Sequence, residues 1–196
     1  MGKIKKPRRE QEVPAPKQIT PKYVKNAVPA EEKLGWTVNP LKDAIEKEKF
    51  NKKFILTENT RIFKGVTLYQ IQAVRAFDAV QVGELGGWVS DDRRLSHYGN
   101  CWISEQAAIY EQGHVAGDAW ATQGTVVRGN AKLYGKACIF CDVVLEGNCR
   151  VEGDTQLGGS ISMGGKLYLK GEGLRFDTKE ELTAYLKSEF EKRRAK

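Results

Sequence analysis

The sequence lacks the features of membrane and exported proteins. None of its apolar runs reaches the roughly 20 residues that a membrane-spanning helix needs, and its first residues carry no apolar core of a signal peptide. Its four cysteines are irregularly spaced, which argues against a disulfide framework. We therefore expect a protein made in the cytoplasm and without a membrane partner, with a place in a virus particle as the alternative.

Side chains for catalysis and metal binding are also scarce. His97 and His114 are the only histidines among the 196 residues, and no glycine-rich loop leads from a strand into a helix as in phosphate-binding motifs. Cys138 and Cys141 have C-x-x-C spacing, but a zinc site needs two further ligands. We interpret the cysteines as structural, because free cysteine is usually buried, and we predict neither a metal nor a cofactor.

Proline and excess positive charge are confined to the beginning of the chain. All six prolines lie among the first forty residues. Residues 1–53 contain 14 lysines and arginines against 7 acidic residues, whereas residues 54–196 contain 18 of each kind. The first segment also has too few apolar residues to fold alone. The sequence thus predicts a neutral body preceded by a basic, proline-rich extended arm, with a short helix over residues 41–52.

Three interpretations of this arm remain open. A basic cluster near its start could bind the phosphates of nucleic acid: Lys3, Lys5, Lys6, Arg8 and Arg9. A solvated tail is favoured over nucleic-acid binding, since blocks of like charge are usually tails and no aromatic residue interleaves the cluster for base stacking. Spaced apolar residues such as Tyr23 and Trp36 suit, in the third interpretation, an arm that orders on a partner or a neighbouring subunit.

Residues 101–172 divide into twelve consecutive hexads without an insertion. The third residue of each hexad is apolar: Ile103, Ile109, Val115, Ala121, Val127, Leu133, Ile139, Leu145, Val151, Leu157, Met163 and Leu169. The fifth residue is glycine in eight of the hexads, which suits corners that need left-handed backbone angles. A fixed period of six predicts a β-solenoid, and hence a mainly β fold.

A more specific pattern precedes and opens the array. Residues 86–89 read GGWV, residues 95–96 read LS, and residues 99–103 read GNCWI. Together with the hexads, these motifs resemble the YdcK-type hexapeptide-repeat proteins of bacteria and bacteriophages. The resemblance implies a left-handed parallel β-helix of triangular section with three hexads per coil. Related solenoids form trimers about parallel axes, and many are coenzyme A-dependent acetyltransferases that use a histidine as general base.

The remaining segments are predicted to close the two ends of this β-helix. Residues 54–82 contain β-branched and aromatic runs, with a turn at Gly65, and are predicted to form a hairpin-like cap. The β-helix itself is predicted over residues 83–172. Residues 173–196 are predicted to form an amphipathic helix that opens with a capping box, Thr178 with Glu181. Its apolar stripe consists of Leu182, Tyr185, Leu186 and Phe190.

The second and fourth residues of each hexad are expected to point outward, and they sort into three faces. Two of these faces are too apolar for contact with water, and their largest members are Trp102, Trp120, Phe140, Tyr110, Val126 and Val144. Such a surface usually marks a partner. We predict that these residues bind other copies of the chain in a homotrimer, or a larger assembly. The alternative is a monomer whose own arm or helix covers both faces.

These observations favour a non-enzymatic structural or interaction protein. The family resemblance makes a phage-related component, such as a virion or accessory protein, the specific expectation. One alternative is an acyltransferase or a ligand-binding trimer. Its candidate bases are His97 and His114, although no loop interrupts residues 101–172 to form an acceptor pocket. The other alternative is nucleic-acid binding through the basic arm.

Overall fold

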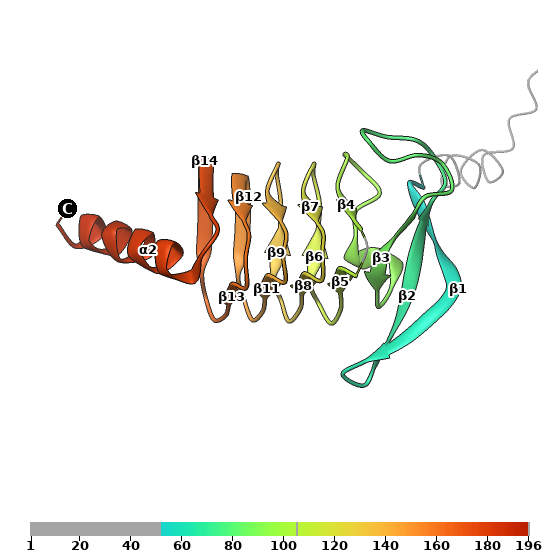
Figure 1. The fold of residues 1–196 in the computed structure, drawn as a ribbon, viewed down its shortest axis with the longest axis horizontal. Helices are drawn as coiled ribbons and strands as arrows, with labels where there is room; N and C mark the ends of the chain where they lie inside the picture. Colours follow the sequence, from blue (N-terminus) through green and yellow to red (C-terminus); the bar gives the residue numbers. More distant parts are fainter. Residues whose placement is uncertain (1–51, 105, 196) are drawn as a thin grey trace, which may run out of the picture. The chain divides into compact units, whose positions relative to one another are not determined.

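A computed structural model describes residues 52–104 and 106–195 of the protein. The described chain is a stack of short parallel strands with a β-hairpin at one end and a helix at the other (Figure 1). The predicted mainly β fold, a parallel β-solenoid with a β cap and a C-terminal helix, is confirmed. The arm lies almost entirely outside the described residues, as do its basic cluster, its predicted helix, Tyr23 and Trp36.

The cap is an antiparallel hairpin. Strand β1 (Phe54–Phe63) pairs with β2 (Val66–Ala73), and the turn between them carries positive φ angles at Lys64 (49°) and Gly65 (80°). Strand β3 (Leu85–Val89) pairs antiparallel with β2 and parallel with β5, the next strand of its sheet. The cap therefore continues directly into the first coil through β3, which covers the edge of β5, whereas β4 ends its own sheet.

The hexads fold into strands of mostly two residues that pair in parallel. These strands are β4 (Trp102–Ile103), β5 (Ala108–Ile109), β6 (His114–Val115), β7 (Trp120–Ala121), β8 (Val126–Val127), β9 (Lys132–Leu133), β10 (Cys138–Ile139), β11 (Val144–Leu145) and β13 (Ser162–Met163). Trp102 pairs with Trp120, and Val126 pairs with Val144, in each case eighteen positions later. Three hexads thus make one coil, as the resemblance implied.

The coils present three outward faces, each made of stacked strands. The first face contains β4, β7 and β10, the second contains β5, β8, β11 and β13, and the third contains β6 and β9. Two longer strands, β12 (Arg150–Leu157) and β14 (Tyr168–Phe176), run parallel to each other and extend past a corner. They continue the third face and then turn onto the first, because Arg150 pairs with Lys132 and Gln156 pairs with Cys138.

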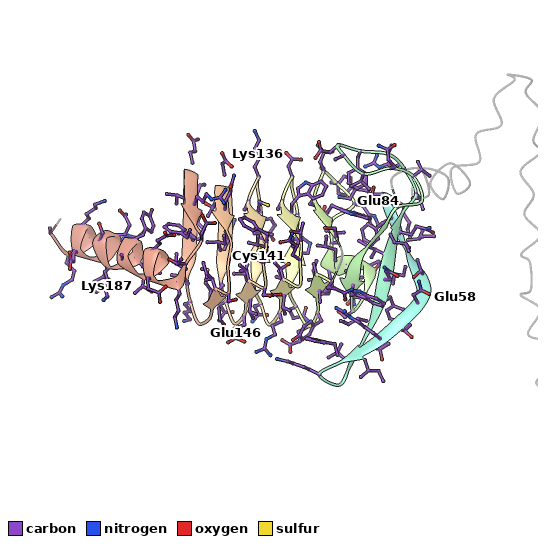
Figure 2. The ribbon with its side chains drawn as sticks, in the orientation of Figure 1. Glu58, Glu84, Lys136, Cys141, Glu146 and Lys187 are labelled. Atoms are coloured by element: carbon purple, nitrogen blue, oxygen red, sulfur yellow. The ribbon has the colours of Figure 1, made fainter. Side chains whose placement is uncertain are left out.

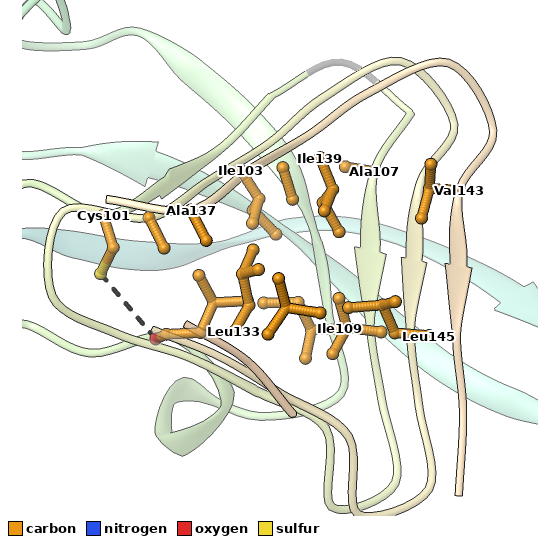
Figure 3. Close-up of a cluster of buried hydrophobic side chains, with 14 of the residues drawn as sticks. Cys101, Ile103, Ala107, Ile109, Leu133, Ala137, Ile139, Val143 and Leu145 are labelled. Carbon is orange, nitrogen blue, oxygen red and sulfur yellow. Dashed lines mark hydrogen bonds between the residues drawn. The ribbon is translucent and has the colours of Figure 1, made fainter. Parts of the chain in front are cut away.

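The core is a column of side chains stacked inside the coils. The third residue of each hexad points inward and is buried, as are the small first residues, and Figure 3 shows Ile103, Ile139, Ile109 and Leu145 pointing into the interior. Because strand side chains alternate between the two faces, the second and fourth residues point outward. The hexad pattern therefore assigns the inside and outside of the solenoid correctly.

The corners confirm the need for left-handed backbone. Gly129 has a φ of 65°, and a Cβ there would lie 2.8 Å from the backbone nitrogen of Gly147 in the next coil. Cys141 occupies the same hexad position and also adopts a left-handed φ, of 56°, although it carries a side chain. Non-glycine corners are thus accommodated at the cost of backbone strain.

The first and last coils depart from the regular spacing. Trp88 pairs with Ala108, twenty positions later, and the longer connection contains a short 3-10 helix, η1 (Asp92–Arg94). In the last coil Thr155 pairs with Leu174, nineteen positions later, at an irregularity in the ladder between β12 and β14. The spacing of eighteen positions between paired residues, which the hexads predict, therefore holds only in the coils between the two ends.

Helix α2 (Lys179–Arg194) closes the far end of the column. Its predicted capping box is present, since the Thr178 hydroxyl accepts from the Glu181 amide and the Glu181 carboxylate accepts from the Thr178 amide. Leu182 is buried in the core, and the Tyr185 ring lies 5.1 Å from that of Phe176. Phe190 remains 62% exposed, so the predicted apolar stripe packs only over its first half.

Candidate functional site

Trp102 is not available to a partner, contrary to the prediction. Its side chain is fully buried because the cap covers the first coil: the rings of Phe77 and Phe54 lie 5.4 and 6.5 Å away. Gly86 approaches the indole so closely that a Cβ would lie 2.6 Å from it. Trp102 therefore anchors the chain's own cap, which is a structural role.

Tyr110 is covered in the same way, and its predicted role in partner binding is also wrong. It is 1% exposed and packs in a second cluster with Leu68 and Ala108. The ring of Phe63, from the tip of the cap hairpin, meets it edge-on at 5.8 Å. The hairpin and the segment with Phe77 that follows it cover these residues, whereas the sequence predicts a cap only at the end of the column.

The apolar surface farther along the solenoid stays partly open. Trp120, Phe140, Val126 and Val144 all point outward and are half-buried. Phe140 lies over Gly158, where a Cβ would come within 2.4 Å of the ring, and the Arg175 guanidinium stacks 5.6 Å from its centre. Of the six solenoid residues predicted to bind a partner, these four thus remain accessible in the structure. Two of them lie on the first face and two on the second.

Charged side chains flank the two valines on the second face. Arg128 and Glu146 form an ion pair beside Val126 and Val144, one coil apart. Figure 2 shows Glu146 on the outer side of β11. This face therefore combines a short apolar row with one cation and one anion.

His114 lies outward on the third face, as predicted, and is half-buried. Its Nδ1 is buried without a hydrogen-bond partner among the described residues, and the Tyr134 ring lies 5.8 Å away. Burial lowers the pKa of His114, and the cations Arg94 and Lys132 lower it further. The imidazole is thus held neutral, which a general base requires, but no described carboxylate contributes to its pKa as the orienting acid of a catalytic dyad would.

His97 belongs to the packing between the cap and the first coil. Its ring stacks on Phe54 at 4.2 Å, its Nδ1 accepts a hydrogen bond from the Lys53 amide, and its Nε2 is buried without a described partner. Burial lowers the pKa of His97, and Lys52 lowers it further. These contacts fix the imidazole between the cap and the first coil, which is a structural role for His97.

A buried lysine near this point was missed from the sequence. Lys53 is fully buried, and its Nζ donates to the carbonyl of Cys101 at 2.6 Å, to that of Gly99 at 3.3 Å and to the Cys101 sulfur at 3.1 Å. Burial lowers the pKa of Lys53 and raises that of Cys101. All three ammonium hydrogens have partners, so this lysine ties the cap to the first coil. Its only sequence signal was one more cation in a basic arm.

The cysteines show no sign of a metal or redox site. Cys138 points outward from a strand and Cys141 sits at the following corner, where its thiol donates to Gln123 Oε1 at 3.0 Å. All four cysteines are free. Within residues 52–104 and 106–195, no three His, Cys, Asp or Glu side chains gather as a metal ion would need.

A groove between β14 and α2 is the feature that sequence reasoning did not anticipate. It has a volume of about 480 Å³ and is lined by residues 166–170 on one side and by Tyr185, Leu186, Glu189, Phe190 and Arg193 on the other. The groove combines apolar side chains with cations, and it forms because α2 packs on the core only through its first half. The one sequence feature that points to this groove is Phe190, the last residue of the predicted apolar stripe, which lies beyond the part that packs on the core.

Comparison with known proteins supports the repeat but covers only part of the chain. No model of a protein family matches it. A protein of Escherichia coli (strain K12) described as "Uncharacterized acetyltransferase YdcK" is 31% identical over 109 residues, which make up 52% of this chain and 30% of that protein. The chain thus matches less than a third of this relative's length.

The similarity and the parallel solenoid together support a hexapeptide-repeat protein. They give no support to the expected link with bacteriophages or virions. Of the helices in the described part of the chain, none is long and apolar enough to cross a membrane.

Proposed function

We propose that this chain is a non-enzymatic interaction protein whose rigid β-helix associates with further copies of itself, as a homotrimer, and serves as a scaffold within a larger assembly. The observation that carries this proposal is the outward row Val126 and Val144. These valines stay partly exposed although the cap covers Tyr110 on the same face. Flat parallel strands of fixed register make such a row a rigid docking surface.

Charge supports self-association of the folded body. Residues 54–196 carry equal numbers of cationic and acidic side chains, so this part of the chain adds no net charge that would oppose its association. The Arg128–Glu146 pair beside the valines supplies one charge of each sign at the rim. Rim charges of this kind fix the register of an interface more than they add to its affinity.

The test is sedimentation velocity of the Val126→Glu/Val144→Glu variant. Both side chains point outward, so the fold should be retained, while two carboxylates in an apolar contact should convert trimer to monomer. Lys132→Gln/Lys136→Gln is the matched control, because it lowers the net charge by the same two units on exposed residues outside this face. Self-association through this face is refuted if both variants sediment like the unmodified chain.

Acyl transfer is the second candidate function. It is favoured by the similarity to an E. coli protein described as an acetyltransferase and by the partly exposed imidazole of His114, whose pKa is lowered by burial. The test is thiol release from acetyl-coenzyme A in the presence of amine and hydroxyl acceptors. Acyltransferase activity should disappear in His114→Asn and persist in His97→Asn; release no faster than in buffer overturns this candidate.

A further inference from the structure

The last coil of the solenoid ends in an unpaired strand edge. β14 pairs with β12 on one side, and no strand of the described residues pairs with its other side. Within the solenoid, residues at the second and fourth hexad positions bond to the following coil: the Lys132 amide donates to the Cys149 carbonyl, and the Tyr134 amide donates to the Val151 carbonyl. Tyr168 and Lys170 hold these positions in the last coil, so their amides and carbonyls point away from β12.

This free edge forms one wall of the groove between β14 and α2. Residues 166–170 line it on this side, and the last three of them belong to β14 and span about 10 Å of extended chain. α2 forms the opposite wall with Phe190, which is 62% exposed, and with the half-buried Leu186. An unpaired edge beside an apolar wall is the arrangement in which an added strand gains ladder hydrogen bonds and side-chain burial together.

The charges around the groove indicate the composition of a strand that could bind there. Lys166, Lys170 and Arg193 line it, against one acidic residue, Glu189, which pairs with Lys192. Lys170 is paired with Glu152, whereas Lys166 and Arg193 have no ion pair within the described residues. The groove is therefore cationic and complements acidic side chains.

We propose that this groove binds an extended segment of a partner protein in which acidic and apolar residues alternate, and that the segment adds as a strand to the free edge of β14. Its backbone bonds to Tyr168 and Lys170, its apolar side chains cover Phe190 and Leu186, and its carboxylates meet Lys166 and Arg193. This surface is separate from the valine row, so it stands independently of self-association.

Two other occupants fit the groove less well. A second copy presenting its own β14 edge would bring Lys166, Lys170 and Arg193 against the same three cations. The arm of the chain carries twice as many cations as acids over residues 1–53, so it too has the wrong charge. An acidic segment from another protein is the occupant that the charges favour.

The experiment is a backbone amide NMR titration of the full chain with a synthetic peptide of alternating Glu and Val. We expect saturable shifts at the Tyr168 and Lys170 amides. Lys166→Glu/Arg193→Glu should weaken binding by about tenfold, because each exposed pair contributes modestly and is here replaced by repulsion. Lys179→Glu/Lys187→Glu is the matched control, because it changes the charge by the same four units; it should leave affinity unchanged, since both lysines are exposed on α2 outside the groove, as Figure 2 shows for Lys187.

A second peptide tests the strand itself. The same Glu and Val sequence with alternate amides methylated keeps the charge but cannot form ladder hydrogen bonds, so its binding should be lost. Equal binding of the methylated peptide, or shifts spread over all surface cations, would overturn the proposal. So would concentration-dependent shifts at Tyr168 without peptide, which indicate a second copy, or nuclear Overhauser contacts between Phe190 and residues 1–51, which indicate the arm.

Discussion

At the corners of the coils, individual residues decide how closely successive coils can stack. Gly129 has a φ of 65°, and a Cβ at this position would clash with the backbone of the next coil. Gly129→Ala should therefore lower the free energy of unfolding by about 2 kcal/mol. Cys141→Gly should raise it by about 0.5 kcal/mol, because it removes the strain of a side chain at φ 56°. Urea denaturation measures both, and a destabilised Cys141→Gly would contradict this account of the corners.

The two histidines predict how stability depends on pH. Burial lowers the pKa of both His97 and His114 below their ordinary 6.5. Between the lowered folded value and 6.5 the unfolded chain binds more protons, so the free energy of unfolding should rise with pH through this range and fall on acidification. The slope from both histidines fades about one pH unit above 6.5, where the unfolded chain has also lost these protons.

Guanidinium denaturation between pH 5 and pH 7.5 measures this slope. His114→Asn removes one of the two groups and should flatten the profile, while retaining the outward position of the side chain. A free energy of unfolding that increases as the pH falls from 6.5 to 5 would show that the imidazoles are stabilised in their charged form, contrary to their surroundings.

Among the elements, helix α2 shows which features a local sequence pattern can predict and which it cannot. The capping box places its start correctly, because that motif depends on residues three positions apart. The stripe of Leu182, Tyr185, Leu186 and Phe190 predicts a buried face, but burial also depends on how long the underlying column is. The last coil ends before it reaches Phe190, and the sequence of the helix contains no information about that.

A pair of truncations in α2 tests this division. Leu182→Ala should lower the free energy of unfolding by about 2–3 kcal/mol and speed amide exchange along α2, because Leu182 is 4% exposed and part of the core. Phe190→Ala, the matched truncation on the same stripe, should change it by no more than about 0.5 kcal/mol. Equal losses from the two changes would mean that the helix packs along its whole length.

The cap marks the limit of prediction for the candidate site. The alternation of the hexads correctly placed Trp102 and Tyr110 outward from the solenoid. Their burial depends on Phe54, Phe63 and Phe77, which lie 25 to 48 positions earlier in the chain. Contacts at such separation follow from the register of the hairpin and not from a local pattern. The same holds for Lys53, whose Nζ makes its three hydrogen bonds to Gly99 and Cys101 of the first coil.

At the scale of the molecule, the period of six predicts the fold but does not predict the function. Twelve hexads fix an inside, an outside and a spacing of eighteen because each coil repeats the one before it. The groove at β14 and α2 arises where repetition stops, so no repeat pattern indicates it. The regular coils thus account for the scaffold. The groove depends on its irregular end, and the accessible row of Val126 and Val144 depends on how far the cap extends along the solenoid.

The central claim is that the β-helix acts as a self-associating scaffold, and the most direct measurement is the mass of the full chain in solution. The subunit has a mass of 22.0 kDa. Light scattering across a dilution series should give three times this mass at the higher concentrations. A constant 22.0 kDa throughout the series would contradict the claim, because Val126 and Val144 would then face water in the working protein.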